Sequence, residues 1–472
     1  MKNEPRRFMA EERSAIVIGG GVAGLCAAHL LAERLGRDSV LLLEKADEVG
    51  GYCRTDHHDG FLCDWGPNGF IDRDPVMREW IYKLRLSDQM VAADAASARR
   101  FLLRKGRLVE IVPPPKIFLS PVMSLPARLR MLCEPLIRAR RNGDPETIWQ
   151  FARRRLGREA ADVLVSSMVT GVFAGDAKAL SVAHCFPRLK AWECEHGSLF
   201  AGMRAQRKTN RTAGVSGPLG GALTTFKDGI GQLPQRAAEL LGEVVHCGAA
   251  AERIERAGDA FAVTTAGGTN YQTEAVVVAT PPTAAGRLVA QLDGDLANAL
   301  RHVPSASIAV ACLAYPRARV KHPLDGFGYL VPPGEGGRVI GCIWTHSVFP
   351  HSAPEDYVFL RAMIGGARDP DAVNLSEAAL LDEVRREIEP LLGIDGAPTY
   401  VKVYRHKDAI PQYTLDHGRV LDAVEQAERA HPGLAFAGNG YWGVGLIDAV
   451  NSAHRAVEKA LESVAARAGD IF

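Results

Sequence analysis

Short apolar runs and longer helical patterns alternate from the start of the chain. Ala15-Ile16-Val17-Ile18 is a continuous apolar run, which is typical of a strand buried in a parallel sheet. It precedes a predicted helix from Val22 to about Leu35, and a second apolar strand follows over Ser39 to Leu43. Strand, helix and strand in this order predict the first unit of a doubly wound, Rossmann-like α/β domain.

A second group of short strand patterns lies far downstream, over Val244 to Cys247, Ala250 to Arg256, Ala260 to Thr265 and Ala275 to Pro281. The group ends on a buried valine run and a proline-containing turn, which predicts a return to the first sheet. A last helix is predicted to end at about Val464. We therefore expect a nucleotide-binding domain that is assembled from separate segments of the chain.

The segment from Pro113 to about Gln206 has a different, helical character. A hairpin with its turn at Lys105-Gly106 precedes it, and Val112-Pro113-Pro114-Pro115 ends that hairpin. Asp144-Pro145-Glu146 predicts a helix start, because it offers an acidic N-cap and a proline in the first turn.

Apolar and basic residues interleave within this helical segment. The arginines are Arg128, Arg130, Arg138, Arg140, Arg141, Arg153, Arg154, Arg155 and Arg158. A basic amphipathic region can lie on an anionic bilayer. Arginines on an ordinary solvated helical face give the same pattern, so both interpretations stay open. Val215 to Gly221 predicts a linker back to the first domain.

Composition narrows the class of protein. The 472 residues are 47% hydrophobic and 24% charged, as in a globular protein of two or three domains. A net charge of +1 gives no field that would select nucleic acid. The nine cysteines have no metal-ligand spacing, so we expect reduced thiols, no metal site and a cytoplasmic protein. Ser14 to Ala32 is long and uncharged enough to imitate a membrane span, but its glycines favour a soluble domain.

The turn after the first strand reads Gly19-Gly20-Gly21-Val22-Ala23-Gly24. Gly19 permits a tight turn, Gly21 lets the backbone approach a pyrophosphate at the helix start, and Gly24 allows the helix to pack on its strand. Glu44, at the end of the second strand, can accept hydrogen bonds from ribose hydroxyls and would repel a 2′-phosphate. The pattern predicts a dinucleotide site that disfavours NADP.

Two further glycine segments indicate a flavin. Gly50-Gly51 suggests a second close backbone approach to an extended cofactor, which bound FAD requires. Near the other end, Gly443-Val444-Gly445-Leu446 opens the last helix. Free N–H groups at Val444 to Leu446 could stabilise negative charge on the N1–C2=O side of a reduced flavin, although a glycine turn that only caps a helix has the same sequence.

The chain resembles the FAD-containing amine oxidase superfamily, and within it the protoporphyrinogen oxidases. The matching segments, in order, are Trp65 to Phe70, Thr170 to Asp176, Gly326 to Pro332, Met363 to Gly366, Ile410 to Tyr413 and Gly443 to Leu446. The resemblance implies an α/β fold with a Rossmann-like, GDI-like FAD-binding domain, a mixed α+β substrate domain and an inserted helical domain. In the family the helical domain is regarded as the membrane-binding part.

The resemblance also implies roles for residues. The cofactor, non-covalent FAD, would contact Gly19, Gly20, Gly21, Val22, Ala23, Gly24, Glu44, Lys45, Gly50, Gly51, Gly66, Pro67, Asn68, Gly69, Ala251, Val444, Gly445 and Leu446. A porphyrinogen would contact Asn68, Gly171, Phe327, Leu330 and Met363. Flavin N5 would accept hydride and molecular oxygen would reoxidise the flavin. No side chain presents itself as a catalytic acid or base, because His184, His196, His302, His346 and His406 lie outside the matched motifs.

Some positions depart from the family pattern. Ala251 stands where valine is expected, and Asn68 stands where some relatives have arginine, so the partner of a substrate carboxylate is undefined. Coproporphyrinogen, with four carboxylates, is an alternative substrate that Arg99, Arg100 and Arg104 could serve. Carotenoid desaturases and amine oxidases are weaker alternatives. A non-catalytic binding protein with the same fold is an alternative from another class.

The resulting domain prediction has seven segments. They are FAD-binding parts 1–98, 222–290 and 431–472, substrate-domain strands 99–112, the helical domain 113–206, a linker 207–221 and the substrate-binding domain 291–430. Peripheral association with the cytoplasmic face of a membrane and a homodimer stay open.

Overall fold

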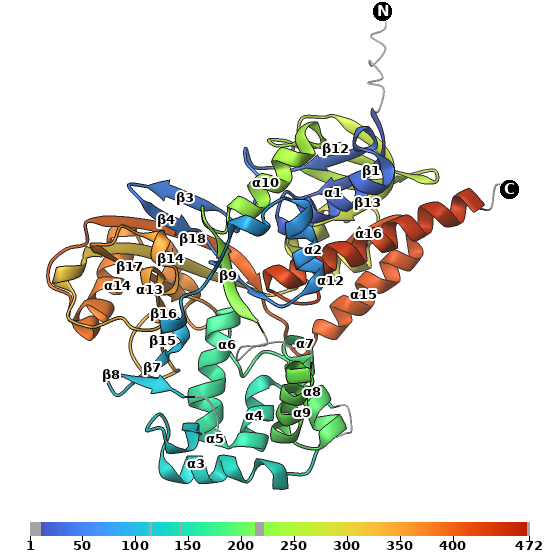
Figure 1. Ribbon diagram of the computed structural model, residues 1–472. Helices are drawn as coiled ribbons and strands as arrows, with labels where there is room; N and C mark the ends of the chain where they lie inside the picture. The colour runs from blue at the N-terminus through green and yellow to red at the C-terminus, as the bar shows by residue number, and fades with distance from the viewer. Residues whose placement is uncertain (1–10, 113–115, 141–143, 213–220, 470–472) are drawn as a thin grey trace, which may run out of the picture.

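The computed structural model describes residues 11–112, 116–140, 144–212 and 221–469. Within them the chain forms two large sheets and a helical unit below them, with the first sheet and the long last helix at the top (Figure 1). The predicted linker falls largely on residues 213–220, and Pro113 to Pro115 and Arg141 also lie outside the described residues.

The first sheet combines parallel strands from distant parts of the chain with two antiparallel strands at one edge. Its strands are β1 (Glu11–Ile18), β2 (Val40–Leu43), β10 (Val245–His246), β11 (Ala251–Ala257), β12 (Ala260–Thr265), β13 (Asn270–Val278) and β19 (Leu434–Phe436). The order is β10-β2-β1-β13-β12-β11, and β19 pairs with β13. Parallel pairing of β1 with β2 and β13 confirms the predicted return of the downstream strands to the first sheet.

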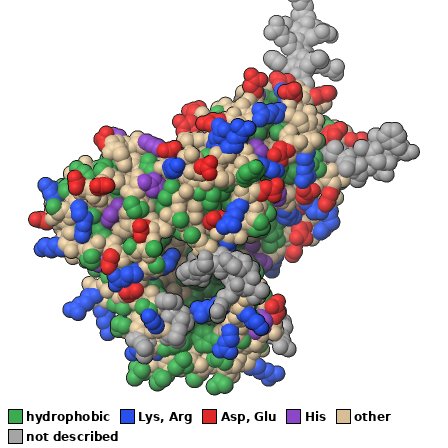
Figure 2. All heavy atoms as spheres, viewed as in Figure 1, with side chains coloured by type: hydrophobic (Ala, Val, Ile, Leu, Met, Phe, Trp, Pro, Cys, Tyr) green, Lys and Arg blue, Asp and Glu red, His purple; other side chains and the backbone are tan. Residues whose placement is uncertain are grey.

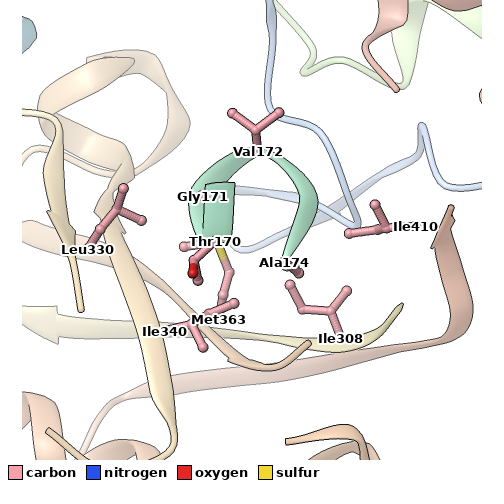
Figure 3. A pocket seen from close by; sticks show the side chains of 9 residues that line it. All are labelled: Thr170, Gly171, Val172, Ala174, Ile308, Leu330, Ile340, Met363 and Ile410. Carbon is pink, nitrogen blue, oxygen red and sulfur yellow. The ribbon is translucent and has the colours of Figure 1, made fainter. Parts of the chain in front are cut away.

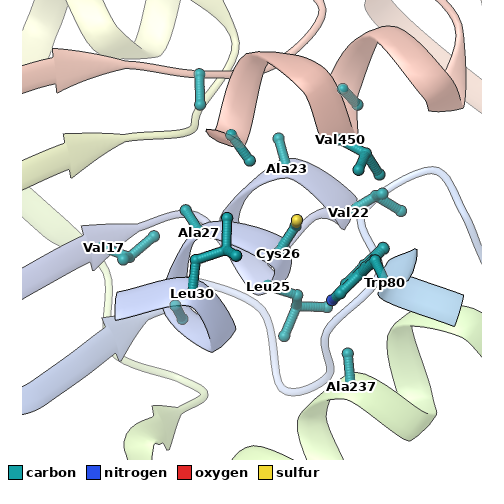
Figure 4. Close-up of a cluster of buried hydrophobic side chains, with 14 of the residues drawn as sticks. Val17, Val22, Ala23, Leu25, Cys26, Ala27, Leu30, Trp80, Ala237 and Val450 are labelled. Atoms are coloured by element: carbon teal, nitrogen blue, oxygen red, sulfur yellow. The ribbon is translucent and has the colours of Figure 1, made fainter. Parts of the chain in front are cut away.

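Alternate residues of these strands bury two different cores. Val17, Leu42 and Val277 face one core with α1 (Val22–Leu35), α2 (Pro75–Lys83), α10 (Gln232–Leu241) and α16 (Leu446–Gly469), part of which Figure 4 shows. Ile16 and Val278 face the other, with α11 (Pro282–Leu288), α12 (Gly294–Arg301) and α15 (His417–Ala430). A strand buried on both faces needs an unbroken apolar run, which explains the sequence pattern. Helices α12 and α15 thus pack on the first sheet, although their residues fall within 291–430, which was predicted as the substrate-binding domain.

The second sheet is mixed and carries the hairpin. Its order is β18 (Tyr400–Pro411), β14 (Ser305–Pro316), β17 (Tyr357–Gly365), β16 (Val339–Trp344), β15 (Gly328–Leu330), β7 (Arg100–Arg104) and β8 (Arg107–Ile111). Lys105 and Gly106 both have positive φ, 50° and 74°, as a two-residue hairpin turn requires. Helix α14 (Glu377–Leu392) covers one face of this sheet.

Smaller elements join the two large sheets. They are the hairpin of β3 (Thr55–His58) and β4 (Phe61–Asp64), the small sheet β5 (Phe70–Asp72), β9 (Ala222–Phe226) and β6 (Met90–Ala92), and the short helix α13 (Thr345–Val348).

The helical unit lies below both sheets. It comprises α3 (Leu125–Leu132), α4 (Ile148–Leu156), α5 (Arg158–Ala160), α6 (Ser166–Phe173), α7 (Val182–Cys185), α8 (Pro187–His196) and α9 (Leu199–Thr212). In the part of the chain that the structure describes, no helix is long and apolar enough to cross a membrane.

The predicted helix start at Asp144-Pro145-Glu146 is wrong, because α4 begins at Ile148. The Thr147 side chain accepts from the Gln150 N–H, and the Gln150 side chain accepts from the Thr147 N–H, which closes a capping box. Glu146 lies before the helix, where it receives hydrogen bonds from Arg154 at 2.8 and 2.9 Å.

Part of the predicted basic face is internal. Arg155 is fully buried and pairs with the fully buried Glu134, while Arg154 bridges Glu146 and Glu193. A buried charge is tolerated only when it is paired and hydrogen-bonded, which these five side chains achieve together. Arg154 and Arg155 therefore hold the helical unit together and are not available to a surface partner.

Candidate functional site

The turn between β1 and α1 has the geometry that each glycine predicts. Gly19 has a φ of +111°, which disfavours any side chain. A Cβ at Gly24 would collide with the carbonyl oxygen of Gly19, so only glycine lets α1 pack this closely. Gly21 is different, because a Cβ there would meet no atom within 4 Å. The structure thus leaves room in front of Gly21, at the start of a helix.

The start of α1 is suited to an anion. Gly21 is the N-cap and no side chain caps the helix, so the first N–H groups, at Val22 and Ala23, have no side-chain partner. The N–H of Gly50 donates to the Gly20 carbonyl at 2.8 Å, which brings the second glycine pair against the first turn. Gly51 follows with a φ of +58°. These residues fit a pyrophosphate that is approached by backbone from two sides.

Glu44 lies at the carboxyl end of β2, beside the same turn. Its carboxylate accepts from the N–H of Gly20 at 2.6 Å and from the N–H of Ala46 at 2.8 Å, so its position is fixed. Lys45 is exposed next to it, and Ala251 begins the edge strand β11. A fixed carboxylate at this edge can receive ribose hydroxyls, as the sequence predicts.

The segment from Trp65 to Gly69 lies between the sheets. Arg361, buried in β17, donates to the carbonyl oxygens of Asp64 and Gly66 at 2.9 and 2.7 Å. His406 Nε2 lies 2.8 Å from the carbonyl oxygen of Trp65, and burial lowers the pKa of His406 below 6.5, which favours the neutral ring. Two residues of the second sheet therefore fix the backbone of this segment.

Asn68 and Thr280 carry unsatisfied polar atoms at the predicted site. The Asn68 Nδ2 and Thr280 Oγ1 atoms are buried and have no hydrogen-bond partner in the described residues. Thr280 lies beside Gly19, since its methyl group is 3.3 Å from an ideal Cβ there. Buried polar groups without partners are costly, so both atoms fit a site that a polar ligand completes. Gly66 and Gly69 pack closely on the Tyr52 and Thr224 carbonyls, with Pro67 between them.

The loop before α16 is held in place by hydrogen bonds to the Tyr413 side chain. The Tyr413 hydroxyl donates to the Asn439 carbonyl at 2.6 Å and accepts from the Gly443 N–H at 2.9 Å. The N–H of Gly445 donates to the Asp448 carboxylate at 2.9 Å, so this amide is already used, contrary to the expectation of free amides from Val444 to Leu446. Burial raises the pKa of that carboxyl, whereas the Gly445 hydrogen bond lowers it.

An apolar cavity of about 40 Å³ lies where α6 meets the second sheet. It is lined by Thr170, Gly171, Val172, Ala174, Ile308, Leu330, Ile340, Met363 and Ile410, which Figure 3 shows around the last turn of α6. Gly171, Leu330 and Met363 are predicted substrate residues, and they come together from α6, β15 and β17. An apolar cavity with few polar groups suits a largely apolar ligand.

Two other predicted substrate residues do not line this cavity. Phe327 precedes β15, and its ring lies 5.0 Å below the Arg100 guanidinium. Asn68 lies in the Trp65 to Gly69 segment described above. Three of the five predicted substrate-binding residues thus line the cavity.

Sequence reasoning gave no role to several residues that shape this region, although Gln412 and Tyr413 lie in the matched segment Ile410 to Tyr413. Arg361 organises Asp64 and Gly66, Tyr413 holds the loop at Asn439, and Gln412 donates to the Phe173 carbonyl at 2.8 Å. An arginine inside the apolar strand Tyr357–Gly365 is a readable signal, because an unpaired charge is rarely buried there. Ile308 and Ile340 carry no such signal, since core and cavity isoleucines look alike in sequence, and Ile410 was noted only as part of a matched segment.

Comparison with known proteins gives consistent matches over nearly the whole chain. The family described as "Flavin containing amine oxidoreductase" matches residues 22–461. A chloroplastic protoporphyrinogen oxidase from Oryza sativa subsp. japonica is 30% identical over 471 residues, with 94% of this chain and 87% of the relative covered. A coproporphyrinogen III oxidase from Bacillus subtilis (strain 168) is 27% identical, with 95% and 98% covered.

A solved structure from Exiguobacterium sp. 255-15, determined as a candidate protoporphyrinogen oxidase, has a TM-score of 0.82. It is 24% identical and covers 95% of this chain and 99% of its own. Reduced UDP-galactopyranose mutase is similar with a TM-score of 0.73 at 16% identity, covering 95% and 96%. These similarities concern the fold, which agrees with the predicted α/β class.

Proposed function

This chain belongs to the family of flavin-containing amine oxidoreductases, and we propose that it oxidises protoporphyrinogen IX to protoporphyrin IX in haem biosynthesis. The protein is an FAD-dependent oxidase, and its cofactor is FAD. When bound, FAD would take up a hydride, which carries two electrons, in each cycle, and molecular oxygen would reoxidise the flavin and become hydrogen peroxide. Three such cycles complete the conversion.

The residues of this chain have positioning roles in that reaction. The Gly19 to Gly24 turn, Glu44 and Gly50-Gly51 would hold the dinucleotide, while Arg361 keeps the Gly66 segment in place. The cavity at Gly171 would receive part of the macrocycle on mostly apolar walls. Thr170 is the polar residue among those that line it, and its hydroxyl already donates to the Ser166 carbonyl at 2.9 Å.

The observation that carries this proposal is the cavity. Gly171, Leu330 and Met363 are far apart in sequence, yet they line one apolar space, next to elements that hold the Trp65 to Gly69 segment. Apolar walls suit an edge of a largely apolar tetrapyrrole, which as a whole is far larger than the about 40 Å³ of this cavity.

Coproporphyrinogen III is a second candidate substrate. Curated relatives from Bacillus subtilis and from Propionibacterium freudenreichii subsp. freudenreichii are named coproporphyrinogen III oxidases, at 27% and 28% identity. The two substrates differ in carboxylates and share the chemistry at the bridge carbons.

Anaerobic mixing of the purified yellow protein with each porphyrinogen tests the proposal. We expect loss of the oxidised-flavin absorbance, faster with protoporphyrinogen IX, and porphyrin fluorescence once oxygen is admitted. Faster loss with coproporphyrinogen III would move the assignment to that substrate. No loss with either porphyrinogen would contradict porphyrinogen oxidation.

A location at the cytoplasmic face of a membrane forms part of the proposal. Leu125, Leu129, Leu132 and Leu136 follow a helical spacing on α3 and the turn after it, and they are 59%, 56%, 48% and 83% exposed. Figure 2 shows hydrophobic side chains gathered along this lower edge of the helical unit. Such a row can insert into the surface of a bilayer and bring the site close to a poorly soluble substrate.

A further inference from the structure

We propose that Arg100 and Arg368 bind substrate carboxylates at the two ends of β15 and thereby set how many carboxylates the site accepts. The inference rests on the proposed oxidation of a porphyrinogen. It identifies partners for the substrate carboxylates, which Asn68 leaves undefined because its neutral amide stands where some relatives have an arginine.

Arg368 does not line the cavity but is linked by hydrogen bonds to residues that do. Its Nη2 donates to the Val331 carbonyl at 3.3 Å, and the Val331 N–H donates to the carbonyl of Ile340, which lines the cavity. The N–H of the preceding Ala367 donates to the carbonyl of Ala174, another lining residue, at 2.7 Å. The guanidinium is thus next to the cavity wall formed by α6 and β16.

Backbone geometry explains why the chain reaches this place. Gly365 and Gly366 follow the cavity residue Met363 and have φ of +110° and +82°. A Cβ at Gly366 would collide with the Ala174 carbonyl oxygen. Two successive glycines therefore turn the chain across the end of α6 and bring Arg368 to the rim.

Arg100 lies at the other end of β15. Strands β7 and β15 run parallel, with Leu102 beside Leu330, so Arg100 is two residues earlier on the same face of β7 as Leu102. Its guanidinium lies over the ring of Phe327 at 5.0 Å. Arg100 is therefore on the side of the sheet to which Leu330 contributes its cavity wall.

Both guanidinium groups lack an acidic partner within ion-pair distance in the described residues. Their neighbours Arg99 and Arg104 differ, because Arg99 pairs with Glu110 and Asp325, and Arg104 pairs with Glu335 and Glu159. Partial desolvation lowers the pKa of Arg100 and of Arg368. Each guanidinium donates to a backbone carbonyl, Arg100 to Ala98 at 3.4 Å and Arg368 to Val331 at 3.3 Å. A carboxylate from the substrate would add the ion pair that the described residues do not give them.

The strand positions beside the two arginines lie apart, which favours separate carboxylates. Three residues of extended strand separate Gly328, near Arg100, from Val331, near Arg368, which is about 10 Å of strand. Propionates on one edge of protoporphyrinogen would engage one arginine, whereas the carboxylates distributed around coproporphyrinogen can engage both. The pair therefore acts as a determinant of substrate choice.

Steady-state kinetics of Arg100→Gln and Arg368→Gln with both porphyrinogens test this inference. We expect each variant to raise the KM for coproporphyrinogen III about tenfold with kcat within about twofold, since a charge-assisted hydrogen bond is lost. For protoporphyrinogen IX, only one of the two variants should have this effect. Arg100→Lys and Arg368→Lys should restore much of the loss, and Arg386→Gln, at an exposed arginine on α14, is the matched control.

Methyl esters of the substrates separate carboxylate binding from a structural role. If the arginines bind carboxylates, wild type and both glutamine variants should oxidise the esters with equal KM. An equal loss with acids and esters, or an unchanged KM for coproporphyrinogen III in either variant, would overturn the inference.

Titration with coproporphyrin III, followed by its fluorescence, gives the same comparison without turnover. We expect about tenfold weaker binding to each glutamine variant. A wild type that binds this porphyrin but oxidises neither porphyrinogen would contradict the proposed function and leave the two arginines as carboxylate anchors. Equal binding to wild type and variants would overturn the inference itself.

Discussion

At the residue scale, Gly21 is the clearest test of the cofactor site. Its φ of −74° and ψ of 178° are open to any residue, and a Cβ there meets no protein atom within 4 Å. Gly21→Ala should therefore leave the unfolding temperature of the apoprotein unchanged. It should weaken FAD binding about tenfold or more, because the methyl group occupies the space that a pyrophosphate needs. Titration of apoprotein with FAD, followed by flavin fluorescence, measures this.

Gly294→Ala is the matched control for that experiment. Gly294 also begins a helix, α12, and also has open space around its Cβ position. Its alanine variant should bind FAD like the wild type. Unchanged affinity in Gly21→Ala would mean that no cofactor phosphate lies against this turn.

His417 predicts a pH dependence of stability. It is 2% exposed, stacks on Tyr413 at 4.0 Å, and burial lowers its pKa to about 4 from 6.5. The folded protein therefore resists protonation, and its stability falls as the pH drops from about 6.5 towards 4. Between about pH 7.5 and about pH 5, wild type should lose about 2 kcal/mol more unfolding free energy than His417→Gln.

Urea unfolding at the two pH values checks this difference. His302→Gln, at an exposed histidine, should keep the pH dependence of the wild type. If the unfolding free energy of His417→Gln falls with pH as steeply as that of the wild type, other groups control acid destabilisation.

Single residues differ in how far sequence foretells them. Gly24 and Glu44 could be predicted, because a tight turn and a ribose acid demand particular residue types at fixed spacing. Arg361 could not be placed, since its partners are the carbonyl oxygens of Asp64 and Gly66 on a distant segment. The Gly445 amide was misjudged, because Asp448, one turn along, accepts its hydrogen bond.

At the scale of the element, α6 determines the size of the cavity. A Cβ on Gly171 would lie 2.9 and 3.2 Å from the two terminal carbons of Leu330. Gly171→Ala should displace Leu330 into the cavity and lower kcat/KM for the porphyrinogen at least about tenfold. The apoprotein should stay folded, because alanine favours a helix over glycine by about 1 kcal/mol. Met168→Ala, on the same helix and 38% exposed, is the control.

Kinetics and thermal unfolding of both variants decide this prediction. Wild-type kcat/KM in Gly171→Ala would show that the substrate does not use this cavity. A lower unfolding temperature in that variant would show a packing defect instead of a narrowed site.

Elements themselves follow from sequence when the signal is local. Helix α1 was predicted with its observed ends, because strand, glycine turn and helix are adjacent in the chain. The start of α4 was missed, although Thr147 and Gln150 carry the spacing of a capping box. An acid followed by proline imitated a helix start, but tertiary contacts of Glu146 hold that acid before the helix.

At the scale of the whole molecule, the cavity depends on crossovers that periodicity does not reveal. Gly171, Leu330 and Met363 meet because a helix inserted before β9 packs on a sheet formed mostly after it. All three look like ordinary core or turn residues by composition. Their common location followed only from the family resemblance. Ile308 and Ile340 were not foreseen at all, and Ile410 lay in a matched segment without an assigned role.

The exposed leucine row makes a prediction about the molecule as a whole. Burial in lipid of each leucine side chain is worth about 1.5–3 kcal/mol, so two charged substitutions should abolish most binding that depends on the row. Leu129→Glu with Leu136→Glu should lower binding to phosphatidylglycerol vesicles at least about tenfold in sedimentation assays. Leu415→Glu, at a 38% exposed leucine outside the helical unit, should bind like the wild type.

Raising the salt concentration distinguishes the apolar from the electrostatic contribution to membrane binding. Arg138 and Arg158 are exposed near the row, but Arg154 and Arg155 are engaged in internal ion pairs, so the electrostatic share is smaller than the sequence suggests. Wild-type binding should therefore fall only modestly as salt rises, whereas loss of the leucines should remove it at any salt concentration. If high salt abolishes vesicle binding and the leucine substitutions leave it unchanged, the basic residues alone hold the protein at the membrane.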